Sequence, residues 1–213
     1  MENKTQIIYA FIDASNLFYG GKDLEWRVDY EKLFKYLRTK YNCSKIIYYG
    51  GVETHKFEYS IVDYYKPIDL TQLTEHLVKK MRNPHTEEKD VILIDKHIKQ
   101  IKFYQKLESF GYELRLKPVK SYQDIDGNPI KKANCDVDMT FDLMRLMGQY
   151  DNAIIISGDG DFIPVISYLR HKERKVKVLA YSDCASIELK QMLASDFTSF
   201  TTLKNILRFN KHD

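Results

Sequence analysis

Acidic side chains follow two apolar runs of the sequence at the point where each run ends. The stretch IYAFIDASN (8–16) passes from apolar residues into Asp13, and IIISGDGDF (154–162) passes into Asp159 and Asp161. Both runs are bounded by turn-forming residues and predict buried strands. Functional sites of open parallel sheets lie outside the carboxyl ends of the strands. If the two strands are neighbours, their carboxylates meet at one edge of the sheet.

A third acidic cluster lies in the stretch NCDVDMTFDLMRLMGQ (134–149). Helical spacing places Asp138 and Asp142 on one face and an apolar stripe on another. Asp136 would point away from Asp138 if both were helical. We therefore expect Asp136 to precede the first turn and to cap the helix N-terminus.

Crowded carboxylates of this kind have a defined chemistry. They repel one another and raise each other's pKa values unless a cation neutralises them. A set with oxygen ligands and without His or Cys suits Mg²⁺ or Mn²⁺. Such an ion activates water and stabilises charge on a phosphoryl oxygen, which phosphodiester hydrolysis requires. The candidate set is Asp13, Asp136, Asp138, Asp142, Asp159 and Asp161, with Asn16 beside the first.

Each motif also has a purely structural interpretation. Asp, Ser and Asn side chains bond nearby backbone N–H groups, so Asp13 could be a turn or cap residue. The segment SGDGD (157–161) could be a glycine-rich turn followed by a cap, and 134–149 a capped amphipathic helix with a solvated face. Two separate strands that both end on carboxylates favour a shared site over chance.

The elements that must position these residues alternate regularly along the chain. Strands are expected at 6–12, 45–50, 111–119, 153–157 and 175–181, and helices at 29–41, 70–82, 96–110, 138–147, 160–171 and 185–194. Such alternation predicts an open, doubly wound α/β fold with a mostly parallel sheet. We expect one domain over residues 1–213, with an insertion within 53–101 because that segment exceeds what a simple crossover needs.

Bulk composition describes an ordinary globular protein of 213 residues with a net charge of only +3. A nucleic-acid footprint, if present, must therefore be local. The three cysteines are widely spaced and the six histidines form no zinc pattern, which favours a reduced cytoplasmic protein without zinc. The apolar run near the N-terminus is too short for a signal peptide or a membrane span, so no membrane association is expected.

Three segments together resemble the NYN domain family, a branch of the PIN-like metal-dependent nucleases. They are FIDASNL (11–17), KKANCDVDMTFDLM (131–144) and IIISGDGDFIPVI (154–166), and they occur in the family's order. With its flanking elements the resemblance covers most of residues 6–201. It implies a PIN-like three-layer α/β/α sandwich and a Mg²⁺- or Mn²⁺-dependent ribonuclease, most simply an endonuclease.

The resemblance also implies roles for individual residues. Asp13, Asp136, Asp159 and Asp161 would hold the metal directly or through water, and Asn16 would orient Asp13 or contact the substrate. Asp142 corresponds to the later Asp of the family's second motif. The correspondence of Asp138 to a family residue is less secure. Ser15 and Ser157, within the same motifs, are expected to bind substrate with Asn16.

Substrate phosphates need basic side chains, and these are dispersed. Lys117, Lys131 and Lys132 precede the acidic helix and could hold the phosphates of single-stranded RNA. Solvated lysines on strand edges are the alternative for each of them. The basic run RHKERKVK (170–177) fits a helix end without any ligand.

Other functions remain open from the sequence. One is a non-catalytic RNA-binding or scaffold module of the same fold, and whatever the function, the insertion could shape substrate access or mediate self-association as a homo-oligomer. Another is a different Mg²⁺-dependent phosphoryl hydrolase. Many such phosphatases have an Asp-x-Asp pattern after the first strand, whereas Asp13 is followed by Ala14 and Ser15. A P-loop enzyme is disfavoured because no GxxxxGK[ST] motif occurs.

Overall fold

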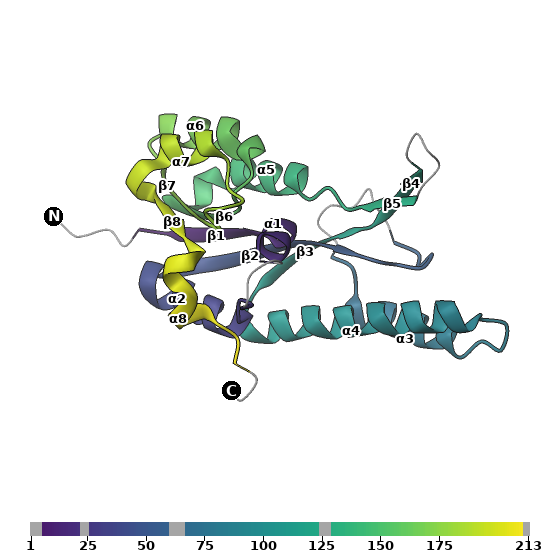
Figure 1. Cartoon of the computed structure of the whole chain (residues 1–213). Coiled ribbons are helices and arrows are strands. Elements are labelled where there is room, and N and C mark those ends of the chain that lie inside the picture. Colours follow the sequence, from purple (N-terminus) through teal and green to yellow (C-terminus); the bar gives the residue numbers. More distant parts are fainter. Residues whose placement is uncertain (1–5, 22–25, 60–66, 124–128, 211–213) are drawn as a thin grey trace.

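A six-stranded parallel sheet forms the centre of the molecule (Figure 1). The computed structural model describes residues 6–21, 26–59, 67–123 and 129–210, and at 121–123 and 129–132 it describes the backbone alone. The strands are β1 (Ile8–Asp13), β2 (Cys43–Val52), β3 (Glu113–Pro118), β6 (Asn152–Ile156), β7 (Lys175–Ala180) and β8 (Phe197–Ser199). Their order across the sheet is β3-β2-β1-β6-β7-β8, and every pair is parallel. A separate antiparallel hairpin joins β4 (Lys120–Gln123) to β5 (Pro129–Lys132).

Helices cover both faces of the sheet (Figure 1). One layer holds α5 (Asp136–Arg145), α6 (Ile163–His171) and α7 (Ile187–Leu193), and the other holds α2 (Tyr30–Tyr41), α3 (Leu70–Met81), α4 (Glu88–Phe110) and α8 (Lys204–Leu207). Each layer has its own apolar core: Ala10 and Ile12 of β1 belong to one, and Tyr9 and Phe11 to the other. A strand buried on both faces has to be apolar throughout, which explains the run before Asp13. The predicted three-layer α/β/α fold with a mostly parallel sheet is confirmed.

The strand order reverses between β1 and β6. From β1 the chain moves outward through β2 and β3, then returns to the other side of β1 and continues through β6, β7 and β8. In the β1–β6 pair Ile12 lies opposite Ile156, so that Asp13 and Ser157 follow at the same level of the sheet. A reversal point of this kind opens a crevice at the carboxyl ends of the two strands.

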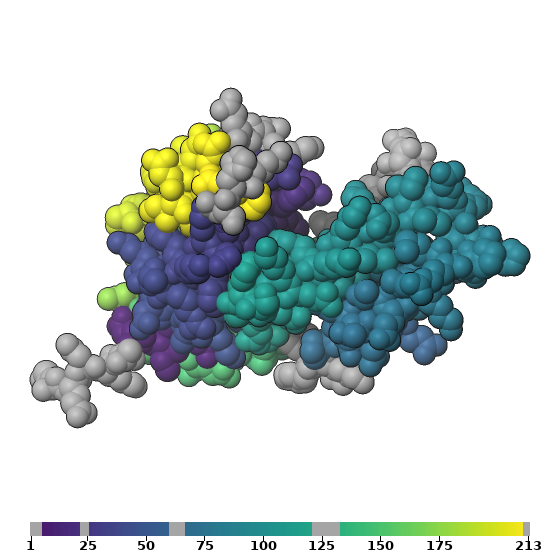
Figure 2. Space-filling view, turned by 90° about the horizontal axis from the view of Figure 1, so that it is seen from below, coloured from purple at the N-terminus to yellow at the C-terminus, as the bar shows by residue number. Residues whose placement is uncertain are grey.

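Helices α3 and α4 pack against each other and extend beyond the sheet as an arm, which Figure 2 shows in teal. α4 is 23 residues long and begins at Glu88, eight residues before the expected start. It also contacts α2, β2 and β3, so it serves as the crossover between β2 and β3. The insertion within 53–101 stays a prediction, and the arm is the part of that segment that would form it.

Two further expectations concern membrane association and the location of the protein in the cell. Within the described ranges, no helix combines the length and the apolar character needed to cross a bilayer. Cys43, Cys135 and Cys184 are free thiols, and burial raises the pKa of Cys43 and of Cys135 to about 12. Thiols with such pKa values carry almost no thiolate at neutral pH and are chemically inert. The cytoplasmic location stays a prediction.

Candidate functional site

A cleft of about 1140 Å³ lies at the carboxyl edge of β1 and β6. Four acidic residues line it: Asp13 ends β1, Glu53 follows β2, Asp136 begins α5, and Asp159 follows β6. Ser15 and Asn16 of α1 (Ala14–Gly20) line it as well. We call this the acidic cleft. It brings together acidic side chains from four segments that are far apart in the sequence, at the place where the strand order reverses.

Asp13 is buried, with 5% of its surface exposed, and all its described partners are uncharged. Its Oδ1 accepts the backbone N–H of Ser15 at 3.0 Å and of Asn16 at 3.1 Å, which caps α1. Its Oδ2 accepts the hydroxyl of Ser157 at 3.0 Å. Burial nevertheless raises the pKa of Asp13, and the charge of Asp159 adds to the rise. Asp13 therefore caps a helix, and it is also a buried carboxylate that lies near the carboxylate of Asp159.

Side-chain hydrogen bonds join the ends of β1 and β6. The Oδ1 of Asn16 accepts the backbone N–H of Gly158 at 2.8 Å. Ser157 Oγ, which donates to Asp13, accepts the backbone N–H of Asp159 at 3.2 Å. A Cβ on Gly158 would lie 2.9 Å from the backbone of Ala185, so only glycine fits there without displacing the next loop. The first and third sequence motifs therefore form one interlocked unit.

Removal of the Asn16 side chain tests this unit. Asn16→Ala leaves the buried N–H of Gly158 without its acceptor, which costs about 1–3 kcal/mol. We expect the melting temperature to fall by about 3–10 °C in a calorimetric scan. Asn152→Ala is the matched control, because that side chain bonds Gln6 at an exposed site, and we expect it to change the melting temperature by about 1 °C at most. Equal melting temperatures for the two variants would contradict the interlocked unit.

Asp136 is the first residue of α5 and does not cap it. Cys135 occupies the cap position without a side-chain hydrogen bond, and the Oδ1 of Asn134 accepts the backbone N–H of Asp136 at 3.2 Å. The prediction that Asp136 precedes the first turn was wrong because Asn134 satisfies that N–H from outside the helix. The carboxylate of Asp136 lies in the acidic cleft and in the first turn, where the helix dipole favours negative charge.

Asp138 and Lys117 bind each other outside the lining of the cleft. Lys117 Nζ lies 2.7 Å from the carboxylate of Asp138 and donates to the carbonyl of Asn134 at 2.9 Å. The candidate metal ligand and the candidate phosphate-binding residue thus form one ion pair beside the start of α5. Lys131 and Lys132 lie in β5, and their side chains fall outside the part of the chain that the structure describes.

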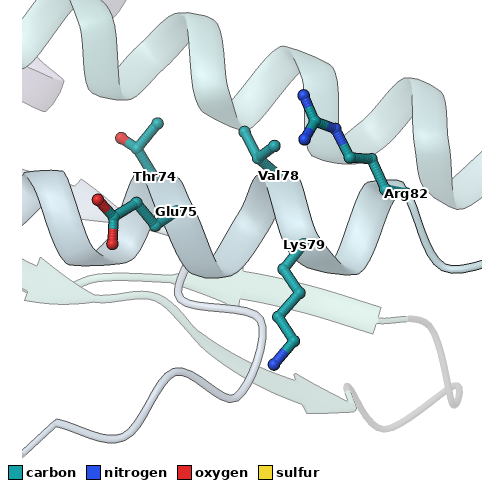
Figure 3. A pocket seen from close by; sticks show the side chains of 5 residues that line it. All are labelled: Thr74, Glu75, Val78, Lys79 and Arg82. Atoms are coloured by element: carbon teal, nitrogen blue, oxygen red, sulfur yellow. The ribbon is translucent and has the colours of Figure 1, made fainter.

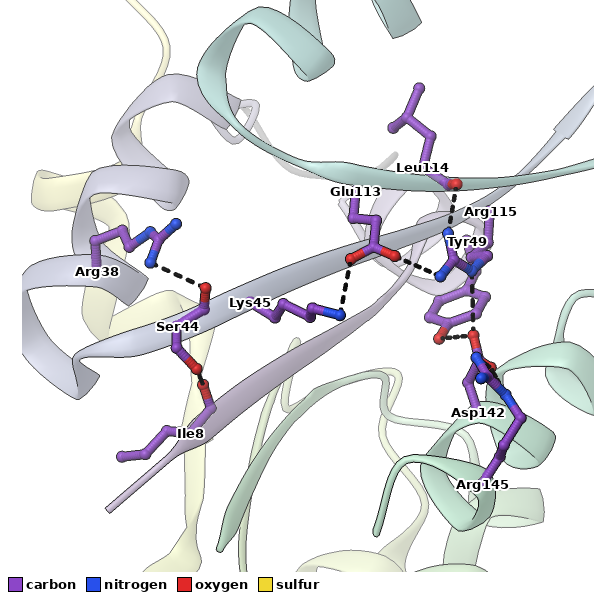
Figure 4. A network of polar contacts seen from close by, with 10 residues as sticks. All are labelled: Ile8, Arg38, Ser44, Lys45, Tyr49, Glu113, Leu114, Arg115, Asp142 and Arg145. Atoms are coloured by element: carbon purple, nitrogen blue, oxygen red, sulfur yellow. Dashed lines mark hydrogen bonds and ion pairs between the residues drawn. The ribbon is translucent and has the colours of Figure 1, made fainter. Parts of the chain in front are cut away.

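Asp142 belongs to a network of polar contacts that joins α5 to β2 and β3 (Figure 4). Its side chain has no exposed surface. Tyr49 Oη donates to it at 2.9 Å, Arg115 Nε lies at 3.3 Å, and Arg145 Nη2 lies at 2.6 Å. Asp142 does not line the acidic cleft, and two guanidinium groups neutralise it. We therefore leave Asp142 out of the proposed metal site.

Asp161 is exposed and does not line the acidic cleft. Its backbone N–H donates to Asp159 Oδ1 at 2.9 Å, which makes Asp159 the cap of the short helix Gly160–Phe162. Asp161 therefore holds Asp159 in place through its main chain.

The donor set fits a hard divalent cation. Asp13 and Asp159 supply oxygens, and burial and the charge of Asp159 both raise the pKa of Asp13 unless a cation lies near its carboxylate. Asp136 offers a third carboxylate to the same cleft. Among the described residues, no three acidic, His or Cys side chains are already close enough together to form a ready ligand set.

Several cleft residues were not predicted from the sequence. Aromatic and basic side chains share the lining: Phe18, Tyr19, Tyr104, Tyr181, Arg27 and Lys96. The buried His97 also lines it, and its Nδ1 lies 2.6 Å from Nε2 of His55. The helical spacing of Ser15 to Phe18 and Tyr19 could have revealed the two aromatic residues of α1, but the arm that carries Lys96 and His97 has no corresponding signal.

A second hollow lies on the arm (Figure 3). It encloses about 420 Å³ and is lined by Thr74, Glu75, Val78, Lys79 and Arg82, all from α3 or its C-terminal cap. A hollow made by one helix with a single carboxylate offers no convergent polar groups. The acidic cleft is therefore the candidate functional site.

Comparisons with known proteins agree with the fold and with the second and third motifs, whereas the first motif lies outside the matched residues. The family model of the NYN domain matches residues 59–202, which include Asp136 and Asp159. Low amplitude and bright protein LabA of Synechococcus elongatus is 34% identical over 90 residues, which are 41% of this chain and 48% of that protein. The matched segment thus spans about half the length of that relative.

Solved structures resemble the chain in fold. A protein of unknown function from Vibrio parahaemolyticus covers 98% of this chain, is itself covered to 99%, and shares 19% identity with a TM-score of 0.60. The bacteriophage T5 D15 flap endonuclease in complex with DNA and metal ions matches 88% of this chain and 60% of its own at 16% identity. The TM-score of that pair is 0.43. Because the family model covers more than half of the chain, the protein belongs to the NYN domain family.

Proposed function

We propose that the acidic cleft hydrolyses phosphodiester bonds of RNA with Mg²⁺ or Mn²⁺ held by Asp13, Asp136 and Asp159. The observation that carries the proposal is the arrival of these three carboxylates, from three distant segments, in one cleft at the reversal point of the sheet. RNA is proposed as the polymer because the motifs resemble those of PIN-like ribonucleases.

The bound cation would supply an activated water and charge stabilisation at the phosphoryl oxygen. The chain's own residues fix the positions of the carboxylates: Ser157 holds Asp13, and the N–H of Asp161 holds Asp159. Asn16 holds the two strand ends together. Arg27 and Lys96, on the walls of the same cleft, would attract the substrate's phosphates.

Cleavage of a labelled circular single-stranded RNA tests the proposal. A circle has no ends, so only an endonuclease can open it. We expect the wild type to cut it with Mg²⁺ or Mn²⁺ and not with EDTA, and Asp159→Asn to lose at least about 10³-fold in rate. Asp90→Asn, in the exposed first turn of α4, is the matched control and should cut at the wild-type rate. Equal cleavage by wild type and Asp159→Asn would indicate a contaminant and contradict the proposal.

A non-catalytic RNA-binding module of the same fold is the second candidate. The lack of a ready three-ligand set among the described residues favours it. It predicts binding of the same RNA by the wild type without cleavage under any metal condition. A third outcome, hydrolysis of p-nitrophenyl phosphate without RNA cleavage, would instead support a small-molecule phosphoryl hydrolase. Self-association stays a prediction that sedimentation of the purified chain can test.

A further inference from the structure

Helix α1 presents two consecutive aromatic rings at the mouth of the acidic cleft. Phe18 is 63% exposed and Tyr19 is 65% exposed, and both line the cleft together with Asp13 and Asp159. The residue before them, Leu17, is buried in the core. α1 therefore has one face anchored in the protein and another that holds large aromatic surfaces in solvent beside the carboxylates.

Both ends of α1 are held in place. Asp13 caps the start, so the helix begins at a proposed metal ligand. At the other end Gly20 packs on the ring of Tyr181, where an added Cβ would lie only 2.7 Å from Cδ2. Tyr181 is itself buried and packs on Trp26 and Phe200. The backbone that carries the two exposed rings thus has a fixed position relative to the acidic residues.

Ser15 lies three residues before Phe18 and four before Tyr19, so the three side chains share one face of the helix. Ser15 belongs to the cleft lining as well. A polymer whose phosphate reaches the carboxylates would therefore pass along this face and over the rings.

The rings are arranged edge to face. Their centroids lie 5.3 Å apart and their planes differ by 84°. The open faces of the two rings therefore point in different directions and cannot both continue one parallel stack of bases. Bases of a duplex are stacked on their neighbours and offer no free faces, whereas the unstacked bases of a single strand can lie on aromatic side chains.

We propose that Phe18 and Tyr19 form a base-stacking platform that selects single-stranded RNA over duplex for the acidic cleft. The inference rests on the proposed function, since it assumes that the cleft takes a nucleic acid. Stacking on aromatic rings tolerates any base sequence, because every base has a π-face. Arg27 and Lys96 in the same cleft match the charge of the strand's phosphates.

Equilibrium binding in metal-free buffer tests the platform apart from catalysis. The probe is a fluorescently labelled 12-nucleotide RNA, used as a single strand, as a duplex, and as an abasic single strand with the same backbone. We expect the wild type to bind the intact single strand more tightly than the other two. The double variant Phe18→Ala/Tyr19→Ala should bind the intact strand about 10-fold more weakly or worse. Its affinity for the abasic strand should be unchanged.

Two further variants complete the design. Phe18→Trp/Tyr19→Trp keeps both rings and should retain tight binding of the single strand. Tyr168→Ala removes a partly exposed ring on α6, outside the cleft lining, and should change nothing.

The outcomes separate the platform from the nuclease. One result would support the platform and contradict the proposed reaction. In it, the wild type binds the single strand, the double variant does not, and neither protein cleaves RNA with any metal. If wild type cleaves RNA and the double variant binds all three probes as wild type does, the platform is overturned and the reaction stands. Equal weakening on intact, abasic and duplex RNA overturns the platform, as does a wild type that binds no single strand. Either of these results would leave a protein partner as the alternative occupant of the rings.

Discussion

Asp13→Asn is expected to reduce metal-dependent RNA cleavage by at least about 10³-fold while the folded protein loses no stability. The asparagine oxygen can still accept the N–H groups of Ser15 and Asn16 and cap α1. The amide can still bond Ser157, whose hydroxyl is both donor and acceptor. The variant lacks only the negative charge, which is the property that a cation requires and that burial makes costly.

The effect of Asp13 on stability has a definite pH dependence. Burial raises the pKa of Asp13 in the folded protein, so the folded state binds the proton more tightly than the unfolded state does. The carboxyl therefore favours folding at acid pH, and this contribution is lost as the pH rises through the folded-state pKa. In metal-free buffer at pH 7 we expect Asp13→Asn to melt at or slightly above the wild-type temperature. The difference should shrink toward pH 4.

Melting curves with and without Mg²⁺ check this expectation. Mg²⁺ should raise the melting temperature of the wild type and not that of Asp13→Asn, because a ligand stabilises only the state that binds it. Asp69→Asn is the matched control, since Asp69 caps α3 through the same two bonds and lies outside the cleft lining. A loss of several degrees at pH 7 for Asp13→Asn would mean that its charge serves the helix cap alone.

Asp142→Ala is expected to destabilise the protein strongly while the acidic cleft keeps its residues. The substitution removes a fully buried carboxylate that Arg115 and Arg145 share and that accepts the Tyr49 hydroxyl, while the two partly exposed arginines remain and Arg115 keeps its ion pair with Glu113. Breaking a buried ion pair by removing one partner costs about 3–5 kcal/mol. The melting temperature should therefore fall by about 10 °C or more. RNA cleavage per folded molecule should persist below the new melting temperature.

Asp138→Ala is the matched control for stability, because it lies on the same helix and pairs with Lys117 in a partly exposed place. Such pairs contribute about 0–1 kcal/mol, so its melting temperature should stay within about 3 °C of the wild type. If Asp142→Ala melted like the wild type and lost cleavage, Asp142 would act in the reaction, as its match to the family motif suggested.

The alternation of apolar runs and amphipathic segments was enough to predict the parallel sheet and most of its helices. A strand buried on both faces leaves a clear signature in the sequence, and β1 and β6 both have it. That β1 and β6 are neighbours did not follow from the sequence, which made a shared acidic edge conditional on their pairing, and the structure supplies that pairing. Helix α1 escaped prediction because a seven-residue helix that ends at two glycines reads equally well as a turn.

Helical periodicity predicts which side chains share one face of a helix. It does not predict which residues of other elements contact that face. It placed Asp138 and Asp142 together on α5, yet the structure separates their environments. Asp142 meets Tyr49 and Arg115, which arrive from β2 and β3, and Asp138 meets Lys117 at the end of β3. Packing between distant segments decided which carboxylate was buried, and no local pattern encodes that choice. The early start of α4 has the same origin, since α3 packs beside it.

The pairing of β1 with β6 has a consequence for the newly made protein. Ser157 and Asp13, which touch across this pair, are 144 residues apart in the chain. Asp13 is synthesised before Ser157 and Asp159, so the acidic cleft cannot assemble until those later residues have been added. Contacts between residues far apart in the sequence make folding slow. The proposed metal site therefore forms only when β1 and β6 have paired.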